Sequence, residues 1–460
     1  MRRIGLGGAV AVVMAAACTA FAPVAGASVR VTWMPGFRSP GTPARLNKVG
    51  VVEVGRPTAR NVLVLEPGTS AGGGYFVPLA KWIVQTMPNW QVWSIERREN
   101  LLEDQSVLDR AKQGHALSQE LFNYYLGYLT DSSITTHFQT IPDASVSYAR
   151  QWGMRVAVED LHGVIAAARR LGGQVVLGGH SLGGSVVTAY ATWDFNGKAG
   201  ANDLAGLVYI DGGSGPTGES VALAQTALTN LNSGSPWLSF GGIAAPLAGL
   251  YNSGGSTEAL IDPNGPSIAE SWSALPAYLK PPIPVTNAAQ YGYALDTKTS
   301  VPALRAAQAH LGQLAATGNP RGWNGAGALT PLKRFAEMFS GTGLHGIDGT
   351  EWYFPQRLTD DTAVVADGNA NPAQTVLDVH ATHGRDLPKR LRIYAFGAAL
   401  GGEAIPLAAE TLARQSHIPM SHLTLINRQS TYAHNDPAGA YPHNDFFNSL
   451  IPFLRRISGR

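Results

Sequence analysis

The sequence of 460 residues predicts an α/β fold built on a mostly parallel sheet. Two observations lead to this class. Short runs rich in β-branched and aromatic residues alternate with segments whose apolar residues recur at helical spacing, and such alternation implies strand–helix–strand units. The alternation stops near residue 213 and resumes near residue 386. A long insertion of different composition therefore separates two parts of one core.

The first part of the core, residues 28–213, contains most of the predicted sheet. Turn residues bound each strand-like run, and the glycine pair 172–173 ends the first strongly periodic helix. The strands are expected at 48–54, 61–66, 90–96, 174–178 and 204–210, and the helices at 154–171 and 183–193. Because strands and helices alternate in this way, the strands are expected to run parallel.

The inserted region, residues 214–385, is rich in Gly, Pro, Ala and Trp and has few strand-like runs. A connection this long is rarely structureless in a compact domain, so we expect a cap over the carboxyl ends of the strands. Residues 301–317 are expected to be helical, and a smaller insertion, about 101–149, is expected to join the cap. The core resumes over 386–460, with strands at 390–396 and 422–427 and helices at 406–413 and 446–457.

Residues 1–27 are predicted to be a secretory signal peptide. Arg2 and Arg3 precede an apolar stretch, and Ala25-Gly26-Ala27 provides small residues for cleavage before Ser28. The mature protein is therefore expected outside the cell. Cleavage also removes Cys18, the only cysteine of the chain, so neither disulfides nor thiolate chemistry are expected.

The charge balance excludes one class of partner. Removing Arg2 and Arg3 with the leader leaves 32 basic residues against 32 acidic ones. A nucleic-acid-binding protein would carry a basic stripe, so no nucleic-acid partner is expected. No second stretch approaches the roughly 18 apolar residues of a membrane span, so no transmembrane segment is expected in the mature chain.

The stretch from residue 174 to 185, QVVLGGHSLGGS, carries the strongest functional signal. It places Ser181 in a G-x-S-x-G pentapeptide between a predicted strand and a predicted helix, the context in which a serine on a strained turn acts as a nucleophile. Gly179 and Gly183 would leave room for the tight turn, and the start of the helix would face developing negative charge. Ser181 is therefore the predicted nucleophile.

With this motif, the sequence resembles the α/β-hydrolase superfamily, in particular secreted serine hydrolases of actinobacterial type related to esterases and lipases. The resemblance is carried by LVLEPGTSAGGGYFVPLA, GGHSLGG and YAHNDP, and it extends over nearly all of the mature chain. It implies an eight-stranded, mostly parallel sheet and a catalytic triad in the chain order serine, acid, histidine. It implies neither a cofactor nor a metal. His180, inside the motif, is expected to point away from the site and to be structural.

Two backbone amides should form the oxyanion hole. One is expected from Leu182, directly after the nucleophile, and the other from the loop that follows residues 61–66. There the superfamily carries His-Gly, whereas this chain has Pro67-Gly68. The position favours the amide of Thr69, with Ser70 as the alternative.

Two histidines are candidates for the general base, because both stand in a His-Asn-Asp tripeptide. His434 falls in the loop between the last predicted strand and the last helix, where a triad histidine belongs in the superfamily. His443 lies at the start of that helix, where a capping or surface role is also typical. His434 is the predicted base and His443 the alternative.

Two residues are candidates for the acid of the triad. Asp211 ends the strand that follows the nucleophile, and Glu403 follows the next strand. Asp211 is favoured because it stands at the carboxyl end of a predicted central strand, the edge at which parallel sheets place their chemistry. His380 and His383 have Asp378 nearby but no third ligand at a recognisable spacing, so no metal site is expected.

The expected activity is cleavage of carboxylic esters through an acyl-enzyme, without cofactor. The expected substrate is a small-molecule or lipid-like ester. Acyl transfer to another alcohol and haloperoxidase-type chemistry use the same triad and stay open as alternatives. A binding protein on an inactive hydrolase scaffold is the alternative of a different class.

Overall fold

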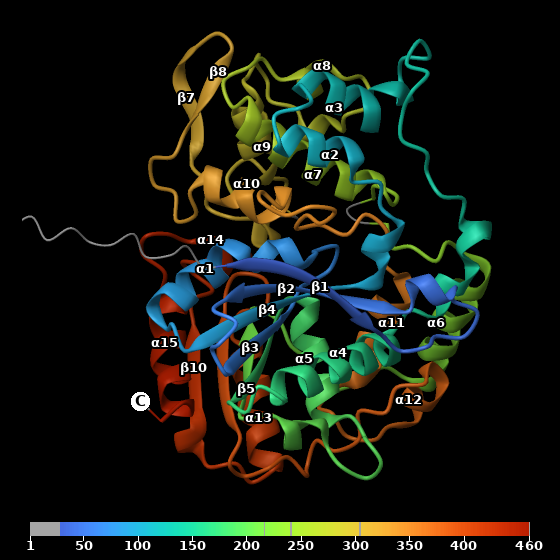
Figure 1. The fold of residues 1–460 in the computed structure, drawn as a ribbon, viewed down its shortest axis with the longest axis vertical. Coiled ribbons are helices and arrows are strands. Elements are labelled where there is room, and N and C mark those ends of the chain that lie inside the picture. Colours follow the sequence, from blue (N-terminus) through green and yellow to red (C-terminus); the bar gives the residue numbers. More distant parts are fainter. Residues whose placement is uncertain (1–27, 216, 240–241, 303–304, 460) are drawn as a thin grey trace, which may run out of the picture.

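The computed structural model describes residues 28–459 except 216, 240–241 and 303–304 (Figure 1). The predicted signal peptide, with Cys18 and the expected cleavage site, lies outside the described residues. No helix in the described part of the chain is long and apolar enough to cross a membrane.

The core of the fold is an eight-stranded sheet in the order β1-β2-β4-β3-β5-β6-β9-β10. β2 pairs antiparallel with both β1 and β4, and the other six strands run parallel to one another. This confirms the predicted α/β class, and the strand order is that of the α/β-hydrolase fold. The strands are β1 (Val29–Pro35), β2 (Lys48–Gly55), β3 (Asn61–Glu66), β4 (Trp90–Glu96), β5 (Val175–His180), β6 (Gly206–Ile210), β9 (Arg392–Gly397) and β10 (Leu423–Asn427).

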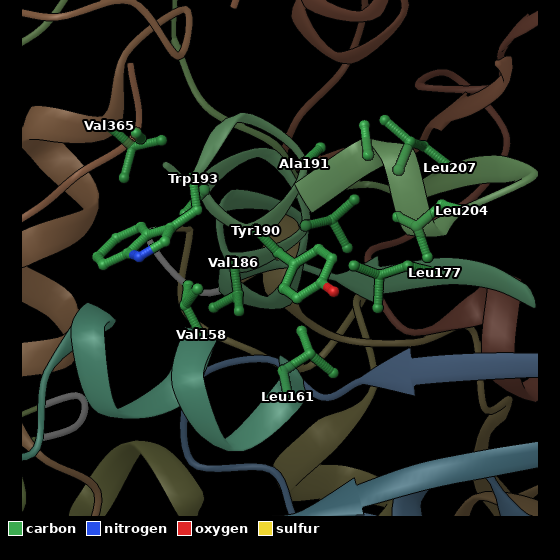
Figure 2. Close-up of a cluster of buried hydrophobic side chains, with 14 of the residues drawn as sticks. Val158, Leu161, Leu177, Val186, Tyr190, Ala191, Trp193, Leu204, Leu207 and Val365 are labelled. Carbon is green, nitrogen blue, oxygen red and sulfur yellow. The ribbon is translucent and has the colours of Figure 1, made fainter. Parts of the chain in front are cut away.

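Helices cover both faces of the sheet because the central strands are apolar on both sides. Alternate residues of β3 and β5 enter two separate cores, as the strand period of two requires. One core packs against α4 (Met154–Arg169), α5 (Leu182–Thr192) and α13 (Ala404–Gln415), and the other against α1 (Val77–Thr86) and α15 (Asp445–Ile457). Figure 2 shows the first core, where side chains of α4, β5 and α5 meet around Tyr190.

Most of the two insertions lies above the carboxyl ends of the strands (Figure 1). There α7 packs against α2, α3, α9 and α10, and we refer to this assembly as the cap. Its elements are α2 (Ser106–Lys112), α3 (Ser118–Tyr125), α7 (Leu247–Ile261), α8 (Ile268–Ser271), α9 (Asn287–Leu295), β7 (Gln313–Gly318), β8 (Arg321–Asn324) and α10 (Leu332–Ser340).

Part of the region 214–385 does not belong to the cap. The helices α6 (Val221–Ser233), α11 (Gln356–Val365) and α12 (Pro372–Leu377) lie beside the sheet, where α11 packs on α4 and α5 and α12 packs on α6. Their apolar side chains complete the first core. The remaining short helix, α14 (Asp436–Gly439), precedes α15.

The predicted helix over 301–317 is wrong. The described residues of this segment form a short 3-10 turn (Arg305–Ala307) and then the extended hairpin β7–β8. The buried carboxylate of Asp296 accepts hydrogen bonds from the amides of Leu311 (2.8 Å) and Gly312 (3.1 Å), which ends any helix there. Gly312 also has a φ of +127°. These long-range contacts override the weak helical preference of an alanine-rich run.

A single buried carboxyl in the cap is well suited to a test of pH-dependent stability. Glu258 of α7 is 6 % exposed, and its Oε1 has no hydrogen-bond partner among the described residues. Burial, with a smaller contribution from the charge of Asp262, raises the pKa of Glu258 from 4.5 to about 8. The folded protein therefore keeps a proton that the unfolded chain loses above pH 4.5.

We expect Glu258→Gln to raise the free energy of unfolding increasingly as the pH rises from about 5 to about 8, because glutamine has no proton to lose. The gain per pH unit is at most roughly 1.4 kcal/mol. Melting temperatures measured from pH 5 to pH 9 should diverge from those of the wild type, while the exposed Glu120→Gln should give a parallel curve. Parallel curves for both variants would contradict the prediction.

Candidate active site

Ser181 lies at a sharp turn between β5 and α5. Its φ of +56° and ψ of −128° are rare for a residue with a side chain, and its amide donates to the carbonyl of Ile210 (3.1 Å). A Cβ on Gly183 would lie 2.2 Å from the carbonyl oxygen of Glu66, and one on Gly212 would lie 1.9 Å from that of Ser181. Only glycine allows these backbones to approach so closely.

His434 and Asp211 form a buried hydrogen-bonded pair. His434 Nδ1 lies 2.7 Å from Asp211 Oδ2. Asp211 stands immediately after β6, is 2 % exposed, and also accepts hydrogen bonds from the amides of Ala398 (2.6 Å) and Gly401 (3.0 Å). Burial alone would raise the pKa of Asp211, but the hydrogen bond and charge of His434 and the amide of Ala398 together lower it. The aspartate is thus held as a carboxylate that orients the imidazole.

The histidine of this pair lines the same cavity as the strained serine. His434 is 6 % exposed and, like Ser181, lines a cavity of about 310 Å³ beneath the cap. Because Asp211 engages Nδ1, Nε2 is the ring nitrogen left to accept a proton. The structure therefore brings Ser181, His434 and Asp211 together.

The two alternative residues lie outside this arrangement. Glu403 is exposed at the start of α13, and His443 is exposed before α15. Neither residue lines the cavity, and no described carboxyl other than Asp211 is hydrogen-bonded to His434.

Candidate oxyanion donors lie on both sides of Ser181. Leu182 is the first residue of α5, so its amide has no acceptor within the helix. The amides of Thr69 and Ser70 have no acceptor among the described residues either, and both residues line the cavity. A Cβ on Gly68 would lie 2.7 Å from Ser181 Cβ, which shows how closely this loop approaches the serine. The geometry leaves Thr69 and Ser70 as alternatives.

Arg97 holds this loop, a role that the sequence reasoning missed. Its guanidinium donates to the carbonyls of Pro67 (2.5 Å) and Ala71 (3.2 Å) and pairs with Glu66 (2.9 Å) and Glu351 (3.1 Å). The sequence signal was the charged run Glu96-Arg97-Arg98-Glu99 at the end of a predicted strand, because charged side chains so placed are buried only when they are paired.

His180 does not point away from the site, contrary to expectation. It lines the cavity, and its Nε2 lies 2.9 Å from the backbone oxygen of His434. Burial, assisted by the neighbouring His434, lowers the pKa of His180 to about 3. The neutral ring therefore donates its Nε2–H to the His434 carbonyl and stacks on Tyr75, whose hydroxyl donates to Asn435 (2.8 Å). These contacts support the loop that carries His434.

The cavity is mainly apolar. Its walls include side chains of α7, α9 and α10, and no Asp, Glu, Lys or Arg is among the described residues that line it. The apolar part of the lining comprises Ile243, Leu279, Leu295, Phe335, Phe339 and Leu400. A buried charged group of a ligand would find no ionic partner here.

The histidines considered for a metal lie elsewhere, in surface ion pairs. His380 contacts Asp378 (2.9 Å), which also pairs with Arg155, and His383 contacts Asp386 (3.3 Å). Across the described residues, no group of three or more His, Cys, Asp or Glu side chains could hold a metal ion.

The glycine requirement at the turn can be tested with a matched pair of substitutions. Gly183→Ala would drive a Cβ against the carbonyls of Glu66 and Pro67, whereas Gly163→Ala in the middle of α4 meets nothing within 4 Å. We expect Gly183→Ala to lower the free energy of unfolding by about 1–3 kcal/mol or more. Gly163→Ala should raise it by about 0.5–1 kcal/mol. Urea unfolding measures both, and equal effects would contradict the steric argument.

Sequence comparisons do not assign this chain to a family. No protein-family model matches the chain, and no curated protein sequence is significantly similar to it. Solved structures that it resembles include a protein from Sulfolobus solfataricus provisionally assigned as a lipase, at 14 % identity and a TM-score of 0.48, covering 94 % of this chain and 93 % of that one.

Two further structures resemble the chain. A thermophilic esterase from Thermogutta terrifontis matches at 13 % identity and a TM-score of 0.39, covering 93 % of this chain and 99 % of that one. An α/β-hydrolase fold protein from Nakamurella multipartita matches at 10 % identity and a TM-score of 0.37, covering 94 % of this chain and 100 % of that one. Likenesses this distant carry no functional argument, so the strand order itself defines the fold as that of an α/β-hydrolase.

Proposed function

We propose that this protein is a serine hydrolase that cleaves carboxylic esters through an acyl-enzyme. The observation that carries the proposal is the buried 2.7 Å contact between Asp211 and His434, together with the cavity that His434 lines with Ser181 at its strained turn. A nucleophile, a histidine with one free ring nitrogen and an orienting carboxylate are the parts that such a reaction requires.

Each residue has a defined role in the proposed reaction. Ser181 Oγ attacks the ester carbonyl while His434 Nε2 takes the serine proton, and Asp211 keeps the imidazole in the tautomer that permits this. The amide of Leu182, with that of Thr69 or Ser70, stabilises the oxyanion. His434 then gives the proton to the leaving alcohol, and water releases the acid in a second, equivalent round.

The proposed substrate is an uncharged ester of moderate size. The absence of charged side chains among the described lining residues disfavours a charged substrate, because its charge would lose water without gaining a partner. The cavity of about 310 Å³ lies at the lower end of the size range of small-molecule pockets, roughly 300–1,000 Å³. An acyl or alcohol group of medium length fits this space.

We also propose that the enzyme is exported, with residues 1–27 as the leader. The paired arginines, the apolar stretch and the small residues before Ser28 support this. An enzyme without cysteines beyond the leader, whose stability comes from apolar cores and buried ion pairs, suits an environment of uncontrolled redox state.

The nucleophile and the base are tested by two substitutions. Ser181→Ala and His434→Ala should each lower kcat for 4-nitrophenyl hexanoate by more than about 1,000-fold, because triad members act as a unit. Ser181→Ala should also abolish labelling by a fluorophosphonate probe. The exposed His443→Ala should leave kcat unchanged within about threefold. A large loss of kcat in His443→Ala, with activity retained in His434→Ala, would show that His443 rather than His434 is the base.

The identity of the acid in the proposed triad is tested by a second pair of substitutions. Asp211→Asn should lower kcat by about 10⁴-fold, because the amide stabilises the wrong imidazole tautomer while keeping the shape of the carboxylate. Glu403→Gln should change kcat by less than about tenfold, since Glu403 lies outside the cavity. The opposite ranking, measured with one ester under one set of conditions, would show that Glu403 orients the base.

A further inference from the structure

One glutamine of the cavity wall differs from every other buried glutamine of the described residues. Gln91, Gln105, Gln290 and Gln374 each donate from the side-chain amide to a carbonyl or carboxylate oxygen at 2.7–2.9 Å. Gln308 as a residue is 9 % exposed, and its side-chain amide has no hydrogen-bond partner among the described residues. A mostly buried amide that has no protein partner is available to a ligand that replaces the water around it.

The amide of Gln308 meets the cavity rather than the protein interior. Gln308 lines the cavity together with Ser181 and His434. Neither its side-chain nitrogen nor its oxygen is among the fully occluded, unpaired polar atoms of the described residues. Its small exposed fraction is therefore surface that a ligand in the cavity can contact.

The backbone around Gln308 is fixed against the loop that carries the proposed base. The carbonyl of Gln308 accepts from the amide of Asn435 (3.1 Å), and the carbonyl of Ala306 accepts from the amide of His434 (3.0 Å). The Asn435 side chain also donates to the carbonyl of Ala307 (2.8 Å). Residues 306–308 are thus held at a set distance from the catalytic loop, and the Gln308 amide is preorganised for binding.

A second amide of the cavity is partly available. Asn252 of α7 lines the cavity, and its Oδ1 accepts from the hydroxyl of Tyr291 (2.8 Å), which leaves its Nδ2 without a partner among the described residues. Two uncharged amides beside the apolar part of the lining suit a ligand that is mostly apolar and carries an uncharged oxygen. A charged group would need a counter-charge that the described lining does not provide.

We propose that Gln308 is a specificity-determining residue and that the substrate is an ester carrying a second, uncharged oxygen function, a carbonyl or a hydroxyl, in the part that fills the cavity. This rests on the proposed ester hydrolysis. A plain alkyl ester leaves the Gln308 amide unpaired in the bound state, whereas an oxygenated one pairs it. Sites built to bind a polar group discriminate against analogues that lack it.

The experiment compares matched esters in two arms, because the second oxygen can belong to either product. The acyl arm uses 4-nitrophenyl hexanoate and 4-nitrophenyl 5-oxohexanoate, and the alcohol arm uses pentyl hexanoate and 4-oxopentyl hexanoate. Each kcat/KM is divided by the rate of hydroxide-catalysed hydrolysis of the same ester. In at least one arm, the wild type should favour the oxo ester by about tenfold.

Gln308→Leu is the informative variant, because leucine fills a similar volume without polar atoms. It should lower kcat/KM for the oxo ester much more than kcat/KM for the plain ester and so abolish the preference, and its melting temperature should equal or exceed that of the wild type. The matched control is Gln119→Leu on the exposed face of α3, which should keep the wild-type preference.

The failure of this inference is distinguishable from the failure of the proposed function. Turnover of all four esters with no preference in either arm, or an unchanged preference in a folded Gln308→Leu variant, overturns the role of Gln308 alone. No turnover of any ester by the wild type, with no fluorophosphonate adduct on Ser181, overturns both.

Discussion

The buried guanidinium of Arg97 joins the three parts of the molecule on which the site depends. It pairs with Glu66 at the end of β3 and with Glu351 beside the cap, and it donates to the carbonyls of Pro67 and Ala71 in the loop facing Ser181. Removing one partner of such a buried group leaves an uncompensated charge, so these segments hold their positions together. The proposed oxyanion hole is therefore fixed by an ion pair that is itself outside the cavity.

A second connection ties the cap to the other side of the site. The carboxylate of Asp436, fully buried, accepts from the amides of Ala433 (2.8 Å) and His310 (3.0 Å) and from the hydroxyl of Thr330 (2.8 Å). It thereby fastens the loop around His434 to the segment before β7. Because the inserted region 214–385 is hydrogen-bonded both to the loop facing Ser181 and to the loop around His434, it acts as part of the framework of the candidate site rather than as a separate cover.

Elements that depend on local sequence patterns were predicted correctly, whereas features that depend on contacts between distant parts of the chain were missed. The strands 61–66 and 90–96 and the turn at Ser181 were predicted because alternation, turn residues and glycine spacing are local signals. Residues 301–317 were predicted as a helix because the contacts of this segment with the distant carboxylate of Asp296 leave no local pattern, and β7 begins inside this segment. Asp211 and Glu403 both follow parallel strands, and only the position of His434 in space separates them. His180 and Arg97 donate to backbone carbonyls, and the sequence does not show which carbonyls lie within their reach.

The segment 306–308 connects chemistry and selectivity in one short stretch of chain. Its carbonyls hold the backbone of His434 and Asn435, while the side chain of Gln308 faces the substrate cavity. A backbone shift large enough to move that side chain would also move the base, so the two functions are mechanically coupled. A side-chain substitution at 308 leaves the carbonyls in place and can change selectivity alone. Selectivity can thus be altered at this position without loss of the proposed triad, provided that the backbone contacts to the catalytic loop are kept.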